Sequence, residues 1–220
     1  MTDLIADPFR AARLLLHLRQ EGVMDADVLA AMETIDRAAF VDDPAAAKLA
    51  FEDAMLPIPC GQVMLRPSLT GQLIQAMRLK PARDSRVLLI GFGSGYMAAL
   101  LAELAGHVYA AERFRRLTDE GRARLAGLGI RNVTLRHDDG LAGWPEQGPF
   151  DAIVLAGAVA EAPEGLTGQL RPGGVLVLPA APDPAGQANL VCLDAASGGI
   201  ERRALYQWVP PLSEGRVEAL

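Results

Sequence analysis

A glycine-rich loop that follows an apolar run is the feature that most constrains the fold of this chain. Residues 86–90, RVLLI, have the apolar character of a buried strand, and GFGSG follows at 91–95. Glycines at the end of a strand let the backbone turn tightly and approach a ligand, and a helix that follows them offers unpaired N–H groups. The pattern predicts a strand, a ligand-binding loop and a helix, which is typical of the start of a Rossmann-like domain.

Apolar runs and helical patterns alternate from residue 86 to residue 179. Strands are expected at 86–90, 107–112, 132–137, 150–157 and 173–180, and helices at 96–106, 117–128 and 166–170. Such alternation predicts βαβ units, and therefore a mainly parallel central sheet with helices on both faces. Two further strands, at 188–194 and 203–209, follow without a long helix between them, so at least one antiparallel strand is expected. The fold class is α/β.

The first 80 residues have a different character. Helices are expected at 7–22, with Asp7 as its cap and Pro8 in its first turn, and at 26–35 and 69–79. Between them, residues 40–67 contain four prolines and show no clear period beyond one short helix near 45–49. A long irregular segment in a compact protein is usually functional. We therefore expect a helical, substrate-covering segment at 1–80 and a Rossmann-like cofactor-binding domain at 81–220, joined in one compact unit.

Charge and composition exclude several classes of function. The chain has 21 Lys and Arg against 27 Asp and Glu, a net charge of −6, which argues against nucleic acid as a partner. Its two cysteines cannot build a disulfide framework or a four-cysteine zinc site, and its three histidines lack metal-ligand spacing, so no metal is expected. The first 20 residues resemble neither a signal peptide nor a membrane span. A soluble, cytoplasmic protein is expected.

The spacing of the glycines separates two classes of cofactor. A dinucleotide loop needs Gly or Ala at its sixth position, where this chain has Tyr96. The spacing G-x-G-x-G instead resembles the loop of the Rossmann-like methyltransferases that bind S-adenosylmethionine. Glu112 follows about twenty residues later at the end of a strand, where an acid accepts hydrogen bonds from ribose hydroxyls. Tyr96 itself is expected to pack beside the loop.

A second acidic loop is expected at the same edge of the sheet. Asp139 and Gly140 follow the strand at 132–137, so the acid would accept from the adenine amino group, although Asp-Gly is also an ordinary turn. S-adenosylmethionine is therefore the expected cofactor. The residues expected to bind it are Gly91, Phe92, Gly93, Ser94, Gly95, Glu112, Asp139 and Gly140.

Six stretches resemble the protein-L-isoaspartate O-methyltransferases, in family order and over nearly the whole chain. They are VLAAMETIDRAAFV (28–41), LAFEDAMLPIPCGQ (49–62), LLIGFGSGYMAALLAEL (88–104), RNVTLRHDDG (131–140), GPFDAIVLAGAVAEAPEGLTGQLRPGGVLVLP (148–179) and YQWVPPL (206–212). The segment LPI-x-x-GQ is the distinctive part, because generic methyltransferases lack it. The resemblance implies methyl transfer to the carboxylate of isoaspartyl residues in damaged proteins, a repair reaction, by a monomer.

The substrate segment departs from the family pattern Thr-Ile-Ser-x-Pro, whose Ser is regarded as an active-site residue. Val63 stands at the position of the Thr and Leu65 at the position of the Ser, so both hydroxyls are missing. A hydroxyl that donates to a carboxylate contributes roughly 1.5–3 kcal/mol, which corresponds to on the order of ten- to a hundredfold in rate. Asp53, Gln62, Val63 and Arg66 are expected to line the substrate pocket, and Arg66 would steer a substrate carboxylate and partly offset the missing hydroxyls.

Two alternatives stay open on the sequence. The apolar positions 63 and 65 also suit a methyltransferase with a changed substrate, either another polypeptide or an unknown small molecule. They also suit a catalytically silent protein that binds S-adenosylmethionine as a sensor or scaffold. Among the other candidates, Asp53 suits a helix-end acid as well as a substrate-binding one, and His17 is expected to be solvated on the polar side of the first helix.

Overall fold

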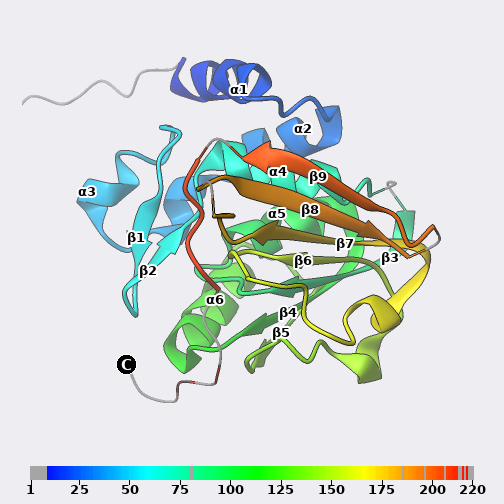
Figure 1. Ribbon diagram of the computed structural model, residues 1–220. Coiled ribbons are helices and arrows are strands. Elements are labelled where there is room, and N and C mark those ends of the chain that lie inside the picture. Colours follow the sequence, from blue (N-terminus) through cyan, green and yellow to red (C-terminus); the bar gives the residue numbers. More distant parts are fainter. Residues whose placement is uncertain are drawn as a thin grey trace, which may run out of the picture.

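A seven-stranded sheet forms the centre of the computed structural model, which describes residues 9–79, 82–184, 186–195, 197–205, 207–212, 215 and 217 (Figure 1). Its strand order is β5-β4-β3-β6-β7-β8-β9. The bounds are β3 (Ala82–Ile90), β4 (Ala105–Glu112), β5 (Val133–His137), β6 (Phe150–Leu155), β7 (Leu170–Ala180), β8 (Ala188–Asp194) and β9 (Ile200–Leu205). Strands β3 to β7 pair in parallel, and β8 and β9 add antiparallel strands at one edge. The expected mainly parallel sheet with an antiparallel edge is confirmed.

Helices of different length cover the two faces of the sheet. On one face, α5 (Tyr96–Leu104), α6 (Arg115–Gly127) and α4 (Pro67–Ala76) share a core with inward residues of the strands, such as Leu89 and Val154. On the other face, the alternate residues, such as Leu88 and Ile153, pack under two loops, which carry Leu141 after β5 and Leu166 before η3. There the short 3-10 turns η2 (Pro145–Gln147) and η3 (Thr167–Gln169) complete the layer. The alternation of side chains along each strand therefore produces two separate cores.

The N-terminal elements pack against the first of these cores. They are α1 (Arg10–Gln20), α2 (Ala26–Thr34), η1 (Arg37–Phe40), α3 (Pro44–Ala47) and the hairpin of β1 (Leu56–Ile58) and β2 (Gln62–Met64). The expected helix caps at Asp7 and Pro8 lie outside the described residues. No helix in the described part of the chain is long and apolar enough to cross a membrane.

Two details differ from the sequence-based expectations. Residues 56–64 form the β1–β2 hairpin, where an irregular segment was expected. The pattern is hidden because each strand has only three residues, Pro57 lies in β1 and Pro59 in the turn, and the turn places Cys60 and Gly61 at positive φ. A cysteine at such a position is not a recognisable turn signal. The last strand is β9 rather than 203–209, and residues 207–212 leave the sheet.

The C-terminal segment crosses the carboxyl ends of the parallel strands. The Ala158 N–H donates to the carbonyl of Pro210, and the Leu212 N–H donates to the carbonyl of Ala158, both at 2.8 Å. Further on, Val217 pairs with the chain beside Phe114. In Figure 1 this red segment runs down between the β1–β2 hairpin and the sheet, so it forms one wall of the edge where ligands bind in open α/β sheets.

Candidate functional site

The glycine loop between β3 and α5 has the backbone conformation that its sequence demands. Gly91, Gly93 and Gly95 have φ values of +80°, +57° and +96°, which residues other than glycine rarely adopt. A Cβ at Gly91 would lie 2.7 Å from Cδ1 of Leu212, so the loop and the C-terminal segment approach each other as closely as glycine permits. Gly95 is the N-cap residue of α5, which directs the free N–H groups of that helix toward the loop.

Glu112 is a buried carboxylate at the end of β4. Its side chain is only 4% exposed, and its oxygens accept hydrogen bonds from the N–H of Gly93 at 2.9 Å and of Phe114 at 3.0 Å. Burial raises the pKa of Glu112 above the usual glutamate range, and the backbone N–H donors offset part of this effect. The residue therefore ties the glycine loop to β4.

Asp139 and Gly140 lie in the loop after β5. One oxygen of Asp139 accepts from the N–H of Leu141 at 3.1 Å, which is the ordinary turn bond, and the other accepts from the N–H of Gly215 at 2.7 Å. Gly140 has a φ of +83°, and a Cβ there would lie 2.9 Å from Cγ2 of Ile90. The chain thus passes too close to β3 for any residue but glycine.

Two small lobes that share lining residues such as Val63 and Gly93 lie at this edge of the sheet. The first has a volume of about 60 Å³ and is lined in part by Glu112, Asp139 and the segment 210–212. The second has a volume of about 40 Å³ and is lined in part by Leu65 and Tyr96. Both lobes are smaller than the roughly 300–1,000 Å³ of pockets that hold drug-sized ligands.

The lobes bring together most of the residues expected from the sequence. Those that line one or both lobes are Gln62, Val63, Leu65, Gly91, Phe92, Gly93, Ser94, Glu112 and Asp139. The ring of Phe92 packs against Gly121 of α6, so only part of this residue borders the lobe. Gly95 and Gly140 belong to the same loops but line neither lobe. Asp53 and Arg66 border a different cavity.

The wall at Val63 and Leu65, where the sequence resemblance implies a Thr and a Ser, is apolar and firmly held. Leu65 is 6% exposed, and its backbone carbonyl accepts a hydrogen bond from the guanidinium of Arg37 at 3.1 Å. Arg37 also donates to the carbonyls of Ala50, Glu52 and Ala54, at 3.2, 3.3 and 2.7 Å. Burial lowers the pKa of Arg37 to about 10, still well above neutrality, so the guanidinium stays charged. One buried cation therefore fixes the backbone of the whole segment 50–65.

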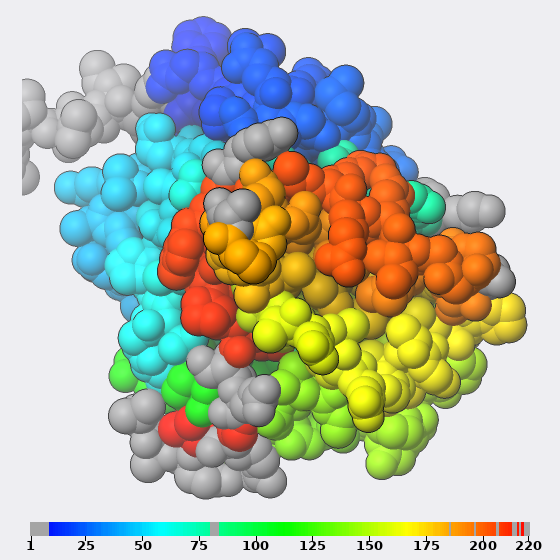
Figure 2. Space-filling view, in the orientation of Figure 1, coloured from blue at the N-terminus to red at the C-terminus, as the bar shows by residue number. Residues whose placement is uncertain are grey.

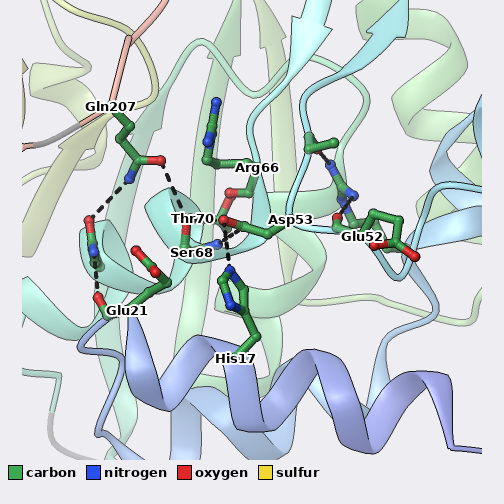
Figure 3. Close-up of polar contacts among 11 residues, drawn as sticks. His17, Glu21, Glu52, Asp53, Arg66, Ser68, Thr70 and Gln207 are labelled. Carbon is green, nitrogen blue, oxygen red and sulfur yellow. Dashed lines mark hydrogen bonds and ion pairs between the residues drawn. The ribbon is translucent and has the colours of Figure 1, made fainter.

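Asp53 organises the start of α4. Its two oxygens accept from the N–H and the hydroxyl of Ser68, each at 2.8 Å, and Nε2 of His17 lies 3.5 Å away (Figure 3). Arg66, the N-cap residue of α4, makes no side-chain cap, so Asp53 caps the helix from another part of the chain. His17 was expected to be solvated. It is instead half-exposed and faces Asp53, because α1 packs beside α4.

Four polar residues in this region were not singled out from the sequence. They are Arg37, Ser68, Gln72 and Gln207. Their partners lie 13 to 139 positions away, so no local pattern connects them. The only usable signal was Pro67, which marks the start of a helix whose next N–H needs an acceptor. Within the described ranges, no group of three His, Cys, Asp or Glu residues could hold a metal ion.

Comparison with known proteins identifies the family. Residues 10–210 match the model of the family Protein-L-isoaspartate(D-aspartate) O-methyltransferase (PCMT). Protein-L-isoaspartate O-methyltransferases of Yersinia pestis and Yersinia pseudotuberculosis are 44% identical over 170 residues, which are 77% of this chain and 80% of theirs.

Solved structures agree at the level of the fold. A protein-L-isoaspartate O-methyltransferase superimposes with a TM-score of 0.78 at 24% identity, over 94% of this chain and 67% of that one. A Plasmodium falciparum chain described as belonging to the same family, in complex with S-adenosyl-L-homocysteine, gives 0.73 at 24% identity, over 91% and 97%. The sequence matches and the α/β fold lead to one conclusion: this chain belongs to the protein-L-isoaspartate O-methyltransferase family.

Proposed function

We propose that the protein transfers a methyl group from S-adenosylmethionine to the carboxylate of isoaspartyl residues in damaged proteins. One observation carries the proposal: in a chain of this family, the glycine loop, the buried Glu112 and the segment 62–65 meet at one edge of the sheet. The alternatives of a changed substrate and of a silent cofactor-binding protein rest on Val63 and Leu65 alone. Family membership over nearly the whole chain does not favour them.

The residues at the sheet edge fit the cofactor. A carboxylate offers about four lone-pair sites, and Glu112 uses one on each oxygen for the N–H groups of Gly93 and Phe114. The remaining sites suit the two hydroxyls of a ribose. We assign the adenine end to Asp139 and Gly140, and the methionine end to the loop 91–95.

The reaction requires little acid–base chemistry from the protein. When bound, the sulfonium of S-adenosylmethionine supplies an activated methyl group. The free carboxyl of an isoaspartyl residue is its α-carboxyl, whose pKa of about 3.3–3.7 leaves it ionised at neutral pH, so no base is needed. The chain's own contribution is to align the carboxylate and to exclude water. Val63 and Leu65 present an apolar wall for the second of these tasks.

We propose that Tyr96 supplies a hydroxyl that the substrate wall lacks. It lines the same lobe as Leu65 and is 3% exposed, and its hydroxyl makes no hydrogen bond with any residue that the structure describes. Burial raises the pKa of Tyr96, so the hydroxyl stays protonated and can donate. We assign it a hydrogen bond to the substrate carboxylate. Thr70 borders the lobe too, but its hydroxyl already donates to the carbonyl of Arg66 at 3.0 Å.

Assays with an isoaspartyl peptide and its aspartyl twin test this function. We expect base-labile methyl ester, released as methanol, on the isoaspartyl peptide only. Tyr96→Phe should lower kcat/KM roughly tenfold, the equivalent of one lost charge-assisted hydrogen bond, while the affinity for S-adenosylhomocysteine is unchanged. Tight cofactor binding with background methylation of both peptides would refute the proposal.

A second experiment restores the family hydroxyls. The variant Val63→Thr, Leu65→Ser should raise kcat/KM on the isoaspartyl peptide on the order of ten- to a hundredfold. Leu128→Ser is the matched control, because Leu128 is exposed at the end of α6. A double variant that is folded but gains nothing would show that these two positions do not limit the reaction.

The remaining features of the proposal follow from the family and from charge. We propose a monomer that acts in the cytoplasm on polypeptides, with residues 1–80 covering the substrate and residues 81–220 holding the cofactor. The net charge of −6 supports a polypeptide rather than a nucleic acid as the methyl acceptor.

A further inference from the structure

A polar cavity of about 560 Å³ lies between α1, α4 and the end of β9, outside the two lobes of the cofactor site. Polar side chains from four separate parts of the chain border it, among them His17, Glu21, Asp53, Arg66, Gln72 and Gln207. Figure 3 shows most of them pointing toward one another from α1, the loop before β1, α4 and the C-terminal segment. The hydrogen bonds that these residues make, and fail to make, show what the cavity can bind.

The orientations of two amide groups are fixed by a backbone carbonyl. Nε2 of Gln72 donates to the carbonyl of Glu21 at 2.7 Å, and since a carbonyl only accepts, Oε1 of Gln72 must point the other way. That oxygen accepts from Nε2 of Gln207 at 3.3 Å, so Oε1 of Gln207 faces the hydroxyl of Ser68, 3.4 Å away.

The hydroxyl of Ser68 cannot satisfy Gln207. It has one proton, which goes to Oδ2 of Asp53 at 2.8 Å, a shorter bond to a charged acceptor. Oε1 of Gln207 is therefore left without a good donor at the edge of the cavity.

Arg66, in contrast, has hydrogen-bond donors without acceptors. Its guanidinium carries five N–H donors, yet no residue in the described part of the chain accepts from it, and its Nε is buried without a partner. In Figure 3 its side chain extends away from Asp53, with no dashed line to a neighbour. The cavity thus combines unused donors on Arg66 with an unused acceptor on Gln207.

The cavity and the methyl-transfer site are connected by short pieces of chain. Leu65 lines the second lobe and the next residue, Arg66, lines the cavity. Gln207 borders the cavity, and Pro210, three residues on, borders the first lobe. Three extended residues span about 10 Å. In Figure 2 the red C-terminal segment is exposed between the cyan and the orange parts of the surface, so an extended peptide could follow it from one site to the other.

We propose that this cavity binds the main chain of the polypeptide substrate about three residues from the isoaspartyl residue, with Gln207 accepting a peptide N–H and Arg66 donating to a neighbouring carbonyl. This inference rests on the function proposed above. The carboxylates of Asp53 and Glu21 border the same cavity and repel an anionic side chain, so a neutral peptide group is the better match for Arg66.

Peptides methylated at single backbone nitrogens test the Gln207 contact. Each flanking amide of an isoaspartyl peptide is N-methylated in turn, which removes one donor. At the amide that Gln207 binds, we expect KM to rise roughly three- to tenfold for the unaltered protein and to stay unchanged for Gln207→Ala. If no amide within four residues of the isoaspartyl residue shows an effect that depends on Gln207, the inference is wrong.

Shortened peptides test the Arg66 contact. Arg66→Ala should raise KM roughly tenfold for a long isoaspartyl peptide, leave KM unchanged for one that stops next to the isoaspartyl residue, and leave kcat unchanged for both. Arg122→Ala, on the exposed face of α6, is the matched control. Unchanged binding of S-adenosylhomocysteine shows that a variant is folded, and equal effects on long and short peptides would overturn the inference.

Peptide binding measured without turnover separates this inference from the proposed function. Trp208 is 61% exposed beside Gln207, so its fluorescence reports peptide binding directly. Background methylation by the unaltered protein would refute the function. Normal methylation, with fluorescence-detected affinities that Arg66→Ala and Gln207→Ala do not change, would refute only the cavity assignment.

Discussion

Replacing Glu112 with glutamine removes one charge from the cofactor site while almost preserving the shape of the side chain. In the structure both carboxylate oxygens accept backbone hydrogen bonds, from Gly93 at 2.9 Å and from Phe114 at 3.0 Å. Glutamine has one oxygen and one NH₂ group, so one of these two N–H donors would face another donor. The change therefore disturbs the glycine loop as well as the proposed ribose contact.

The size of the effect follows from the bonds involved. One charge-assisted hydrogen bond to the backbone contributes about 1.5–3 kcal/mol to the free energy of unfolding. Because burial raises the pKa of Glu112, removal of the buried charge offsets part of this loss, and Glu112→Gln should lower the free energy of unfolding by less than that amount. Loss of the charge and of one acceptor for the ribose should weaken cofactor binding by about 2–3 kcal/mol, or roughly 30- to 150-fold in Kd. Isothermal titration with S-adenosylhomocysteine measures this, with Glu103→Gln on the exposed side of α5 as the control.

The pH dependence of stability and of cofactor affinity tests the role of Glu112 independently. Burial raises the pKa of Glu112 in the folded state above its unfolded value. Its contribution to the stability of the cofactor-free protein is therefore fully present below the unfolded pKa and is lost as pH rises through the folded pKa. Ribose hydroxyls need the charged carboxylate, so cofactor affinity should instead fall as pH is lowered through that raised pKa.

Opposite trends in stability and affinity over one pH window identify Glu112, and both should be missing from Glu112→Gln. If the variant binds S-adenosylhomocysteine within about threefold of the unaltered protein, which is about 0.7 kcal/mol, the ribose assignment is wrong. A variant that keeps the same fall in affinity at low pH would show that another group titrates.

Three further changes test other parts of the site. Arg37→Met breaks the buried cluster of carbonyl contacts around segment 50–65 and should lower the free energy of unfolding in urea by about 3–5 kcal/mol, whereas a loss under about 1 kcal/mol would contradict the clamp role. Gly140→Ala places a Cβ 2.9 Å from Ile90 at a φ of +83° and should destabilise the protein by more than about 1 kcal/mol, measured by thermal unfolding. Leu212→Ala removes the side chain that covers Gly91 and should speed the association of S-adenosylhomocysteine in stopped-flow measurements, and an unchanged rate would show that the cofactor enters elsewhere.

The cofactor half of the site could be predicted because its residues follow the strands that carry them. A buried strand followed by glycines, and an acid at the end of the next strand, are linked by the topology of any parallel sheet. Once β3 and β4 pair in parallel, the ends of both strands lie side by side, and the loop N–H of Gly93 reaches Glu112. The local sequence pattern was therefore enough to predict the contact between the glycine loop and Glu112.

The N-terminal half lacks such a rule. Asp53 reaches Ser68, and Arg37 reaches Leu65, only after several short elements have packed on the sheet. Nothing in the local sequence encodes these pairings, since the elements are too short to show a period and the prolines obscure the β1–β2 hairpin. The buried cation of Arg37 is a tertiary solution for backbone carbonyls that form no regular structure of their own.

The Arg37 contact also explains how a leucine can stand at position 65, where the sequence resemblance implies a Ser, without a change in the position of the backbone. Arg37 holds position 65 by its backbone carbonyl, which every residue possesses, so the substitution changes the chemistry of the wall and leaves its position. The apolar side chain then adds stability through burial. Restoring the Ser should therefore cost about 2–4 kcal/mol, a fall in Tm on the order of 10 °C, while kcat/KM for the isoaspartyl peptide rises. Opposite changes in the two measurements would mean that Leu65 stabilises the wall at the expense of a substrate contact, whereas a fall in both would mean that position 65 only packs.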